Sequence, residues 1–281
     1  MILNKGGRKM KILVNKIRSL TEQSAGTWGI VLEDLDRGAK WISNGDELFY
    51  AASVIKVPIM VAVFSAVERG EISLTDELIL KEDDFVGGSG VLQHLTPGTS
   101  LSICDIVMLM IIQSDNTATN ILIDLVGVEH IVQTMKEAGM EKSTFYNKLM
   151  MNNPRPKGYN QITANDIGKL LKLMATGKLA SEEASKQMIA IMKKQQIKDC
   201  LPEKLPSPYS NFNDGMTPWE LAHKTGWIPG TRHDVGIFYV GQRKLLATVL
   251  SKEEDDLLSK QILAEIGEEI YNYLQESSID I

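Results

Sequence analysis

Residues 53–68 read SVIKVPIMVAVFSAVE. From Val54 to Glu68, apolar residues occupy nearly every side of the segment, a pattern typical of a helix that is buried all round. Pro58 falls in the first turn, where a missing N–H costs little. A lysine inside so apolar a helix must either be paired or have a shifted pKa, and Lys56 is in that position. We therefore expect the fold to enclose this helix, with Ser53 and Lys56 at its start.

Segments that favour β-strands lie at both ends of the chain. Thr27–Glu33 and Ala39–Ser43 flank a turn, which predicts a β-hairpin. Three further strands are expected near the C-terminus, at Ala222–Thr225, Gly236–Val240 and Leu245–Leu250. Apolar residues then recur every fourth position over Asp255–Leu274, which predicts an amphipathic helix. We expect a single antiparallel sheet built from the two ends of the chain.

The segments between these strands have helical periodicity. Helices are expected at Leu101–Gln113, Ala118–Leu125 and Thr163–Met174, the last with Thr163 as its N-cap. We predict an α/β (α+β) fold in one compact unit. Residues 1–50 and 215–281 form its α/β lobe, residues 51–214 form an inserted helical lobe, and the active site lies between the lobes.

Composition excludes two classes of partner. The chain has 281 residues, of which 43% are hydrophobic, and its 30 basic and 36 acidic residues give a net charge of −6. This balance argues against a nucleic-acid-binding protein, which normally has a basic face. The longest apolar run, Ile106–Ile112, is far shorter than the ~20 residues of a membrane-spanning helix. We expect a monomer that acts on a small molecule, without a nucleic-acid or membrane partner.

The first residues and the cysteines bear on the cellular compartment. Met1–Lys16 is basic and has neither an apolar core segment nor a small-residue cleavage site. We therefore expect a cytoplasmic location, or an exported one if a leader has been removed. Cys104 and Cys200 lie far apart and match no metal-ligand spacing, so both are expected to be free thiols.

The first candidate for chemistry is the pair Ser53 and Lys56. A serine hydroxyl is a poor nucleophile until a neighbouring base takes its proton. Three residues apart at the start of a helix, the two side chains share one face. Burial would lower the pKa of Lys56 and let its amine act as that base. The alternative is that Ser53 only caps the helix while Lys56 extends to solvent.

The second candidate is Ser114-Asp115-Asn116, which falls at a break between two helices. A helix break presents side chains into a cleft, where Ser114 can pass a proton and Asn116 can donate to a substrate carbonyl. The alternative is an ordinary turn whose polar side chains cap the next helix.

The third candidate is Lys224-Thr225-Gly226, on a strand directly before Trp227. A glycine at a strand edge leaves room for a substrate to lie alongside it. Lys224 supplies positive charge, and Arg232 can hold a carboxylate through two hydrogen bonds. The alternative is an exposed edge-strand lysine, which discourages aggregation.

In this order, the three motifs resemble the active-site set of class A serine β-lactamases and penicillin-binding proteins. The resemblance covers nearly the whole chain, and residues 223–234 are most similar to the β-lactamase-related hydrolases. It implies a serine hydrolase that cleaves a β-lactam, or a similar cyclic amide or acyl bond, through an acyl-enzyme on Ser53. No metal and no organic cofactor is implied.

The resemblance assigns catalytic roles by position. Ser53 resembles the acylated nucleophile of the family, and Lys56 resembles its proton acceptor. Ser114 matches the serine that delivers the proton to the leaving nitrogen. Lys224 matches the lysine of the third motif, beside the substrate carboxylate.

Substrate-binding roles follow in the same way. Asn116 resembles the side chain that holds the acyl amide of the substrate. Thr225 and Arg232 resemble the rest of the carboxylate subsite, and Gly226 lies where the substrate passes the strand. The backbone N–H of Trp227, with that of the nucleophile, would form the oxyanion hole, in which each donor is typically worth ~3 kcal/mol.

The sequence departs from class A where the family has a glutamate that activates the deacylating water. Counting forward from Gly139, the place of this glutamate falls at or near Leu149. No glutamate occurs from Lys142 to Ser181, and the single acid there, Asp166, is expected inside a helix. Asn153 is the candidate match for the asparagine of the family's loop.

Without that glutamate, we expect acylation with slow release of the acyl group, unless Lys56, Asp84 or another group replaces it. Two alternatives stay open at this point. One is a peptidase or esterase like the penicillin-binding proteins, which β-lactams merely trap. The other is an acyl sensor that never turns over.

The histidines also suggest a Ser-His-Asp site, because His233 and Asp234 are adjacent. Neighbouring residues on a strand point to opposite faces, so these two are not expected to relay a proton. His223 is expected to tune Lys224. Structural roles are the favoured interpretation for all four histidines, His94, His130, His223 and His233.

Overall fold

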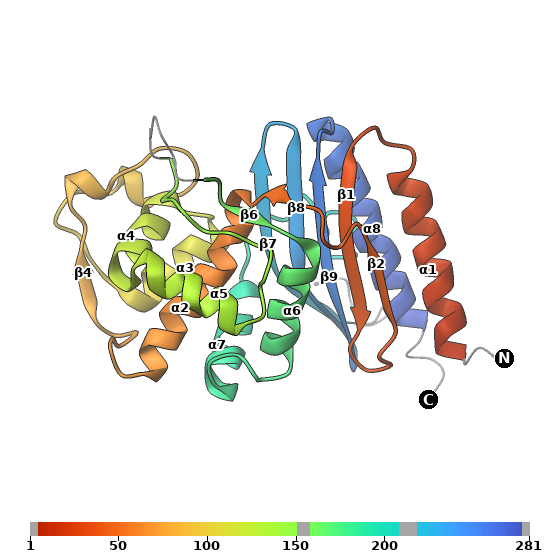
Figure 1. Cartoon of the computed structure of the whole chain (residues 1–281), viewed down its shortest axis with the longest axis horizontal. Helices are drawn as coiled ribbons and strands as arrows, with labels where there is room; N and C mark the ends of the chain where they lie inside the picture. The colour runs from red at the N-terminus through yellow and green to blue at the C-terminus, as the bar shows by residue number, and fades with distance from the viewer. Residues whose placement is uncertain (1–4, 151–157, 208–217, 277–281) are drawn as a thin grey trace.

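A computed structural model describes residues 5–150, 158–207 and 218–276, with residues 5–7 described by their backbone alone. Five strands form one antiparallel sheet in the order β2-β1-β9-β8-β7 (Figure 1). Their bounds are Thr27–Asp34 (β1), Lys40–Ser43 (β2), Trp219–Ile228 (β7), Thr231–Val240 (β8) and Arg243–Lys252 (β9). Thr27 pairs with Lys252, so the two ends of the chain meet in the sheet as predicted.

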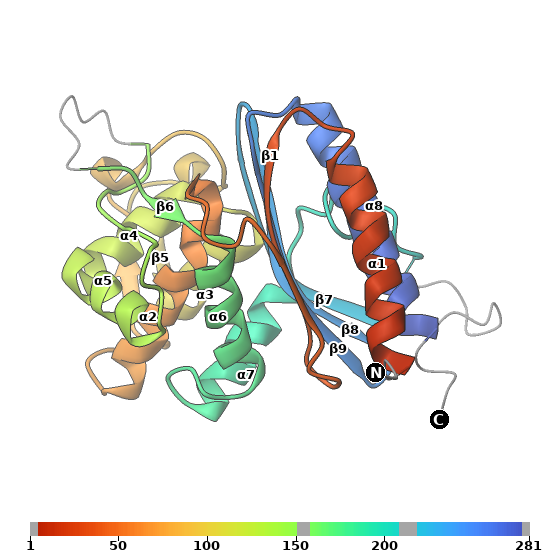
Figure 2. The same cartoon turned by 45° about the vertical axis from the view of Figure 1, so that its right-hand side comes forward.

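Both faces of this sheet are covered, and the strand sequences explain why. Along β1, Ile30 and Leu32 pack into one apolar cluster, while Val31 between them packs into the other. This is the two-residue alternation of a strand, with apolar residues on both faces. Helices α1 (Lys5–Thr21) and α8 (Asp256–Glu276) cover one face (Figure 2).

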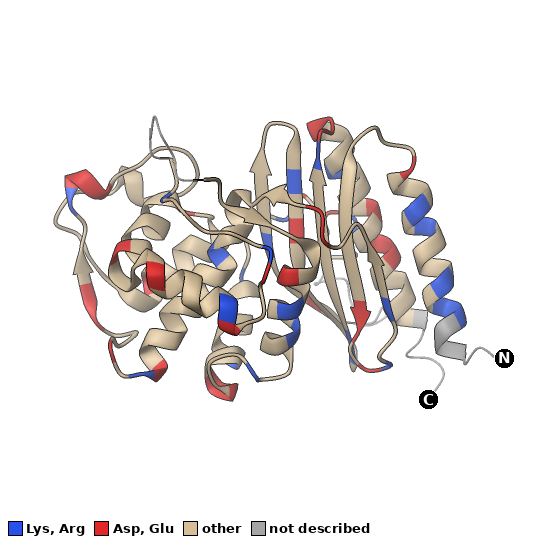
Figure 3. Ribbon diagram, viewed as in Figure 1, with Lys and Arg blue, Asp and Glu red and all other residues tan. Residues whose placement is uncertain are grey.

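Helix α1 was not predicted from the sequence. Its apolar residues Met10, Leu13 and Ile17 are buried, and their spacing is that of one helix face. Its basic residues lie next to the acidic side chains of α8 (Figure 3), and the Lys16 ammonium lies 2.6 Å from a Glu269 carboxylate oxygen. The basic start of the chain is therefore part of the folded structure.

The opposite face of the sheet carries the remaining helices. Their bounds are Lys56–Glu68 (α2), Ile103–Ile112 (α3), Asn116–Val126 (α4), Val128–Glu137 (α5), Ala164–Ala175 (α6) and Glu182–Met192 (α7). Every residue of α2 from Lys56 to Phe64 is buried, which confirms a helix enclosed on all sides. Helices α5 and α7 were not predicted.

Helix caps explain where two of the predicted helices begin. The Thr163 hydroxyl accepts a hydrogen bond from the Asp166 N–H, so α6 begins one residue later, as predicted. The helix expected from Leu101 begins at Ile103 instead. The Ser102 hydroxyl caps it, accepting from the Asp105 N–H at 3.1 Å, while Leu101 lies in a strand.

Short elements complete the helical side. Two small sheets pair β3 with β6 and β4 with β5. The bounds are Phe49–Tyr50 (β3), Glu77–Ile79 (β4), Ser100–Ser102 (β5) and Gln161–Ile162 (β6), and the 3₁₀ helices are Ala52–Ile55 (η1), Glu82–Asp84 (η2) and Leu92–His94 (η3). Strand β3 leads directly into η1 and α2, and so fixes the start of the buried helix.

The structure also bears on two compositional expectations. None of the described helices has the length and apolar character needed to cross a membrane. Cys104 and Cys200 are both free, as expected. Asn153, the candidate match in the family's loop, lies outside the described residues.

Candidate active site

Ser53 lies in η1, where the chain passes from β3 into α2. The residue before it, Ala52, has φ +43°, a left-handed conformation that is strained for a residue with a Cβ. Ile55 is the N-cap of α2 and its side chain makes no capping bond, so Ser53 does not serve as the cap. Its hydroxyl group instead lines a cleft beside the sheet.

Strand β7 approaches Ser53 closely because Gly226 has no side chain. A Cβ at this position would lie 3.1 Å from Val54 Cγ2 and 3.3 Å from the Ser53 backbone nitrogen. Contacts this short leave little room for any larger residue. The glycine of the third motif therefore places the edge strand of the sheet next to Ser53.

Lys56 is fully buried, contrary to the alternative of a solvent-exposed side chain. Its ammonium donates to the Ser114 carbonyl at 2.5 Å, the Ser114 hydroxyl at 3.1 Å and the Asn116 amide oxygen at 2.8 Å. Burial, and to a smaller extent the positive charge of Lys224, lowers the pKa of Lys56 well below its usual value. Asp115 offsets this shift only in part.

Lys224 is also fully buried, although β7 is the edge strand of the sheet. Its ammonium donates to the Ser114 hydroxyl at 3.0 Å and to the Thr225 carbonyl at 2.8 Å. Burial lowers its pKa to about 7, against a smaller opposing effect of Asp234. Both lysines therefore contact one hydroxyl group, that of Ser114.

The second motif occupies the predicted break between α3 and α4. Ser114 has φ +53°, which turns the chain sharply and presents its hydroxyl to both lysines. The Asp115 carboxylate caps α4 at the Ala118 N–H and also accepts from the Val91 and Leu92 N–H groups, at 2.6 and 2.8 Å. Asp115 thus holds the backbone in place and does not pair directly with either lysine.

A glycine-rich segment, residues 87–90, lies directly on the second motif. The Asn116 N–H donates to the Ser89 carbonyl at 2.9 Å, and its side-chain amide donates to the Gly87 carbonyl at 3.1 Å. A Cβ at Gly90 would lie 2.3 Å from the Asp115 carboxyl. Glycine is therefore required for this segment to approach so closely, and the approach brings Ser89 into the cleft.

The cleft has a volume of about 270 Å³. Six predicted residues line it: Ser53, Ser114, Thr225, Gly226, Trp227 and Arg232. The other three predicted residues lie behind Ser114. The hydrogen bonds described above connect Lys56 and Lys224 to its hydroxyl, and Asn116 to Lys56. The structure thus brings together every residue that the three motifs contributed.

Arg232 forms one wall of this cleft. Its guanidinium carbon lies 5.8 Å from the centroid of the half-exposed Trp227 ring, and its Nη1 lies 3.5 Å from Asp199 Oδ2. Its Nε is buried and has no hydrogen-bond partner among the described residues. Such an unsatisfied donor at the wall of a cleft is suited to an anionic ligand.

Three of the four histidines, His130, His223 and His233, make side-chain hydrogen bonds that fit the expected structural roles. His233 donates through Nε2 to the Tyr50 carbonyl at 2.8 Å and accepts at Nδ1 from the Ser251 N–H, and burial lowers its pKa to about 4. Asp234 instead pairs with His223, whose Nδ1 lies 2.9 Å away. The adjacent His233 and Asp234 therefore do not interact as a catalytic pair.

Candidate bases for deacylation are engaged elsewhere. The Leu149 backbone is held on both sides by the Asn120 side chain, at 2.8 and 2.9 Å. Asp166 lies inside α6, as expected, and accepts from the Lys142 and Ser143 N–H groups. The Asp84 carboxylate accepts from the N–H of its neighbour Lys81.

Sequence reasoning missed four residues of the cleft: Ser89, Ile197, Asp199 and Cys200. The glycine-rich segment was a visible signal for Ser89. The other three follow α7, which was itself missed, and no local motif marks them. Burial raises the pKa of the Cys200 thiol, so this residue is a poor nucleophile despite its place in the cleft.

Comparison with known proteins gives a consistent result. A family model described as "Beta-lactamase enzyme family" matches residues 12–274. The β-lactamase BRO-1 of Moraxella catarrhalis is 26% identical over 251 residues, which cover 85% of this chain and 77% of that protein.

Solved structures are also similar. The crystal structure of a β-lactamase from Sphaerobacter thermophilus has a TM-score of 0.84 and 31% identity, covering 96% of this chain and 98% of that one. PBP-A has a TM-score of 0.83 and 28% identity, covering 95% and 97%. A leucine-to-glutamate mutant of PBP-A, solved as an acyl-enzyme complex with penicillin G, has a TM-score of 0.80 over the same shares.

Proposed function

The chain belongs to the β-lactamase enzyme family, and from that membership we propose that it is a serine hydrolase that opens β-lactam amide bonds through an acyl-enzyme on Ser53. One observation carries this proposal. Two buried lysines, Lys56 and Lys224, contact the same hydroxyl, that of Ser114, and this hydroxyl lines the cleft that also contains Ser53. Such an arrangement can move a proton from the attacking hydroxyl to the leaving nitrogen.

Acylation requires a neutral amine near the nucleophile. Burial and the neighbouring cation lower the pKa of Lys56 well below its usual value, which favours its neutral amine, and in this proposal that amine accepts the Ser53 proton. The Ser53 oxygen then bonds to the carbonyl carbon, and the amide C–N bond breaks. The Ser114 hydroxyl gives its proton to the departing nitrogen and is resupplied from Lys56.

The walls of the cleft supply the groups that hold the substrate. A carboxylate on the substrate would bind Thr225 and Arg232, with Lys224 behind them. The Asn116 amide would hold the acyl side chain. We assign the oxyanion hole to the backbone N–H groups of Ser53 and Trp227, where it would stabilise the negative oxygen of the tetrahedral intermediate.

We further propose that deacylation is slow. Asp199 is the single carboxylate among the described residues that line the cleft, and its Oδ2 lies 3.5 Å from both the Arg232 guanidinium and the Lys260 ammonium. This carboxylate oxygen therefore already has two cationic partners. Leu149, at or near the place of the family's glutamate, cannot accept a proton, so the water that would release the acyl group lacks the base that the family supplies there.

Intact-mass spectrometry during reaction with a chromogenic cephalosporin tests both parts. We expect an adduct of one acyl group per chain that forms quickly and disappears slowly, with little colour development after the first turnover. The Ser53→Ala variant should form no adduct. Turnover by Lys56→Ala at the wild-type rate would refute the assignment of the base, and rapid multiple turnover by the wild type would refute slow deacylation.

A second candidate function is a peptidase or esterase like the penicillin-binding proteins. The observation that favours it is the similarity to PBP-A, together with a leucine at the place of the glutamate. For this function, the same protein should hydrolyse a small thioester or a peptide ending in D-alanine while a β-lactam adduct persists. A persistent adduct with no turnover of any of these substrates would instead indicate an acyl sensor.

A further inference from the structure

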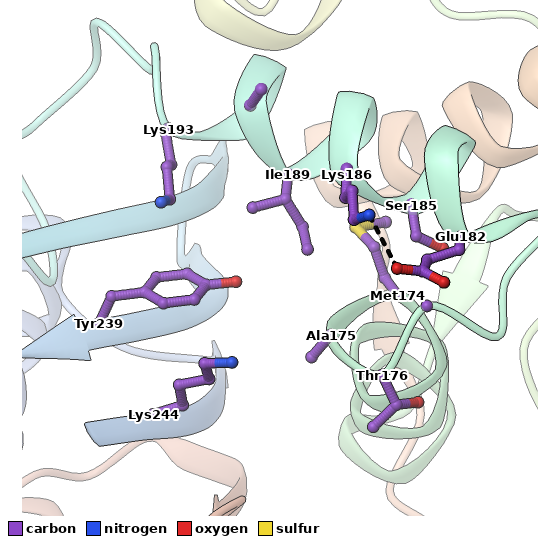
Figure 4. A pocket seen from close by; sticks show the side chains of 12 residues that line it. Met174, Ala175, Thr176, Glu182, Ser185, Lys186, Ile189, Lys193, Tyr239 and Lys244 are labelled. Carbon is purple, nitrogen blue, oxygen red and sulfur yellow. Dashed lines mark ion pairs between the residues drawn. The ribbon is translucent and has the colours of Figure 1, made fainter. Parts of the chain in front are cut away.

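A second cavity lies between the helices and the sheet, away from Ser53. Its volume is about 480 Å³, within the range of small-molecule sites. The end of α6 and one side of α7 form part of its wall, and Tyr239 on β8 and Lys244 at the start of β9 form the opposite part (Figure 4). None of the described residues that line it also lines the catalytic cleft.

The helical side of this cavity has apolar residues beside polar ones, among them the Lys186–Glu182 ion pair. Met174 is buried at the end of α6, and Ile189 on α7 is half-buried. Figure 4 shows the side chains of Ile189 and Ala175 pointing into the space in front of Tyr239. A hydrocarbon chain placed there would exclude water from this surface, and its burial would favour binding.

The opposite wall is aromatic and cationic. Lys193 and Lys244 lie on either side of the Tyr239 ring (Figure 4), and the Lys193 ammonium is 4.2 Å from the ring centroid. The Tyr239 hydroxyl points into the cavity. Burial raises the pKa of Tyr239 to about 12, so the hydroxyl stays protonated and can donate a hydrogen bond.

The charges around the cavity leave one cation available to a ligand. Lys186 lies 2.7 Å from Glu182, and Lys193 lies 2.6 Å from Glu220. The backbone N–H of Lys244 donates to Asp36, but among the described residues no carboxylate pairs with its ammonium. A single unpaired ammonium next to a hydroxyl donor matches one negative charge better than the two charges of a phosphate group.

We propose that this cavity is a second binding site, which takes a small amphipathic carboxylate. The carboxylate of the ligand lies between the Lys244 ammonium and the Tyr239 hydroxyl. Its hydrocarbon part packs against Ile189 and Met174. The site is separate from the catalytic cleft and does not depend on the reaction at Ser53.

Isothermal titration calorimetry with octanoate tests the proposal. Lys244→Ala removes the unpaired cation, and because this side chain is exposed the variant should fold normally. We expect binding to weaken by up to about fivefold, the upper range for an exposed charge pair. Lys11→Ala, which removes an exposed lysine on α1, is the matched control and should bind like the wild type.

A second series tests the apolar wall and the charge of the ligand. Ile189→Gln should weaken octanoate binding, and Ile189→Glu should weaken it further because the new carboxylate repels the ligand. Octanamide, which has the same chain without the charge, should bind the wild type more weakly than octanoate, by up to about fivefold. Equal binding of octanoate to the Gln and Glu variants would overturn the placement of the carboxylate.

The catalytic cleft could also attract a carboxylate, and Arg232→Ala distinguishes the two sites. If octanoate occupies the second cavity, this variant binds it as tightly as the wild type does. The proposal is wrong if Arg232→Ala weakens binding while Lys244→Ala does not. It is also wrong if Lys244→Ala and Lys11→Ala behave alike, or if octanoate shows no saturable binding.

Discussion

Two of the places where the chain buries charge are built in opposite ways. At the end of β1, the fully buried Asp34 carboxylate accepts from the Arg243 guanidinium and the Tyr273 hydroxyl, both at 2.5 Å. Its other oxygen accepts from the backbone N–H groups of Asp36 and Arg37. Each oxygen of this carboxylate therefore accepts from two donors. Of these four donors, one is a cation, the Arg243 guanidinium.

In the catalytic cleft, two cations are buried around one neutral hydroxyl. Lys56 and Lys224 both donate to Ser114, and the nearest acid in the motif, Asp115, holds backbone N–H groups instead. The Asp34 carboxylate is thus surrounded by hydrogen-bond donors, whereas burial in the cleft lowers the pKa of both lysines. The first arrangement contributes stability, and the second lowers stability in order to supply a base.

The largest effect should come from removing the base. Lys56→Met fills the space of the lysine stem without an amine, and we expect acylation by a chromogenic cephalosporin to slow about a thousandfold. The free energy of unfolding should change by no more than about 1 kcal/mol, because a buried cation and its hydrogen bonds are lost together. Stopped-flow acylation and urea unfolding measure the two quantities. A large loss of stability with unchanged acylation would mean that Lys56 stabilises the fold and does not act as the base.

The next effect concerns the paired cluster. Asp34→Asn leaves Arg243 buried opposite a neutral amide, and we expect unfolding to become easier by about 3 kcal/mol. Acylation of Ser53 should keep its wild-type rate at temperatures where the variant stays folded. Urea unfolding with an acylation assay on the same preparation checks this. If acylation slowed in step with stability, the two regions would not be independent.

A carboxylate at the expected place of the family's glutamate would sharpen the contrast. Leu149→Glu introduces one at or near that place, and under the proposed function we expect release of the acyl group to accelerate about a hundredfold. Leu149→Gln is the control, because it has the same length and no basic oxygen. The decay of the adduct is followed by intact-mass spectrometry. Equal decay in both variants would show that residue 149 does not face the acyl group.

The smallest effect is a dependence of stability on pH. Lys224 has a pKa of about 7 in the folded protein and returns to about 10.4 when unfolded. Between these values the unfolded chain binds more protons, so stability rises with pH, by at most about 1.4 kcal/mol per unit for this group. We expect the free energy of unfolding to rise between about pH 7 and 8.5, and to rise less steeply with pH in Lys224→Met. The pKa of the Cys200 thiol is raised in the folded protein, so this group makes stability fall as pH rises. It does so only near its ordinary pKa of 9.0 and above.

The sequence contained most of the site because each motif is local. Ser53 and Lys56 are one helical turn apart, and Lys224 and Gly226 share a strand, so spacing alone predicts their placement. The antiparallel sheet was likewise visible in alternating segments at both ends of the chain. The boundaries of the two lobes stay a prediction.

What the sequence did not reveal depends on long-range packing. Ser89 reaches the cleft only because the glycines beside it let the backbone approach Asn116. Cys200 lines the cleft because the next N–H, that of Leu201, donates to Asp234 on a distant strand. Helix α7, which leads to this segment, has buried Ala184, Met188 and Ile191 at helical spacing, a signal that was present but short.

The pairing of β1 with β9 has a consequence for synthesis of the protein. Thr27 lies opposite Lys252, so the first strand of the sheet stays unpaired on that side until the last strand has left the ribosome. Contacts between such distant residues favour slow folding. Lys224 arrives on the same late hairpins, whereas Ser53, Lys56 and Ser114 are made much earlier. A nascent chain therefore holds the serine without the second lysine, and it becomes able to react with an acyl donor only after β7 has been made.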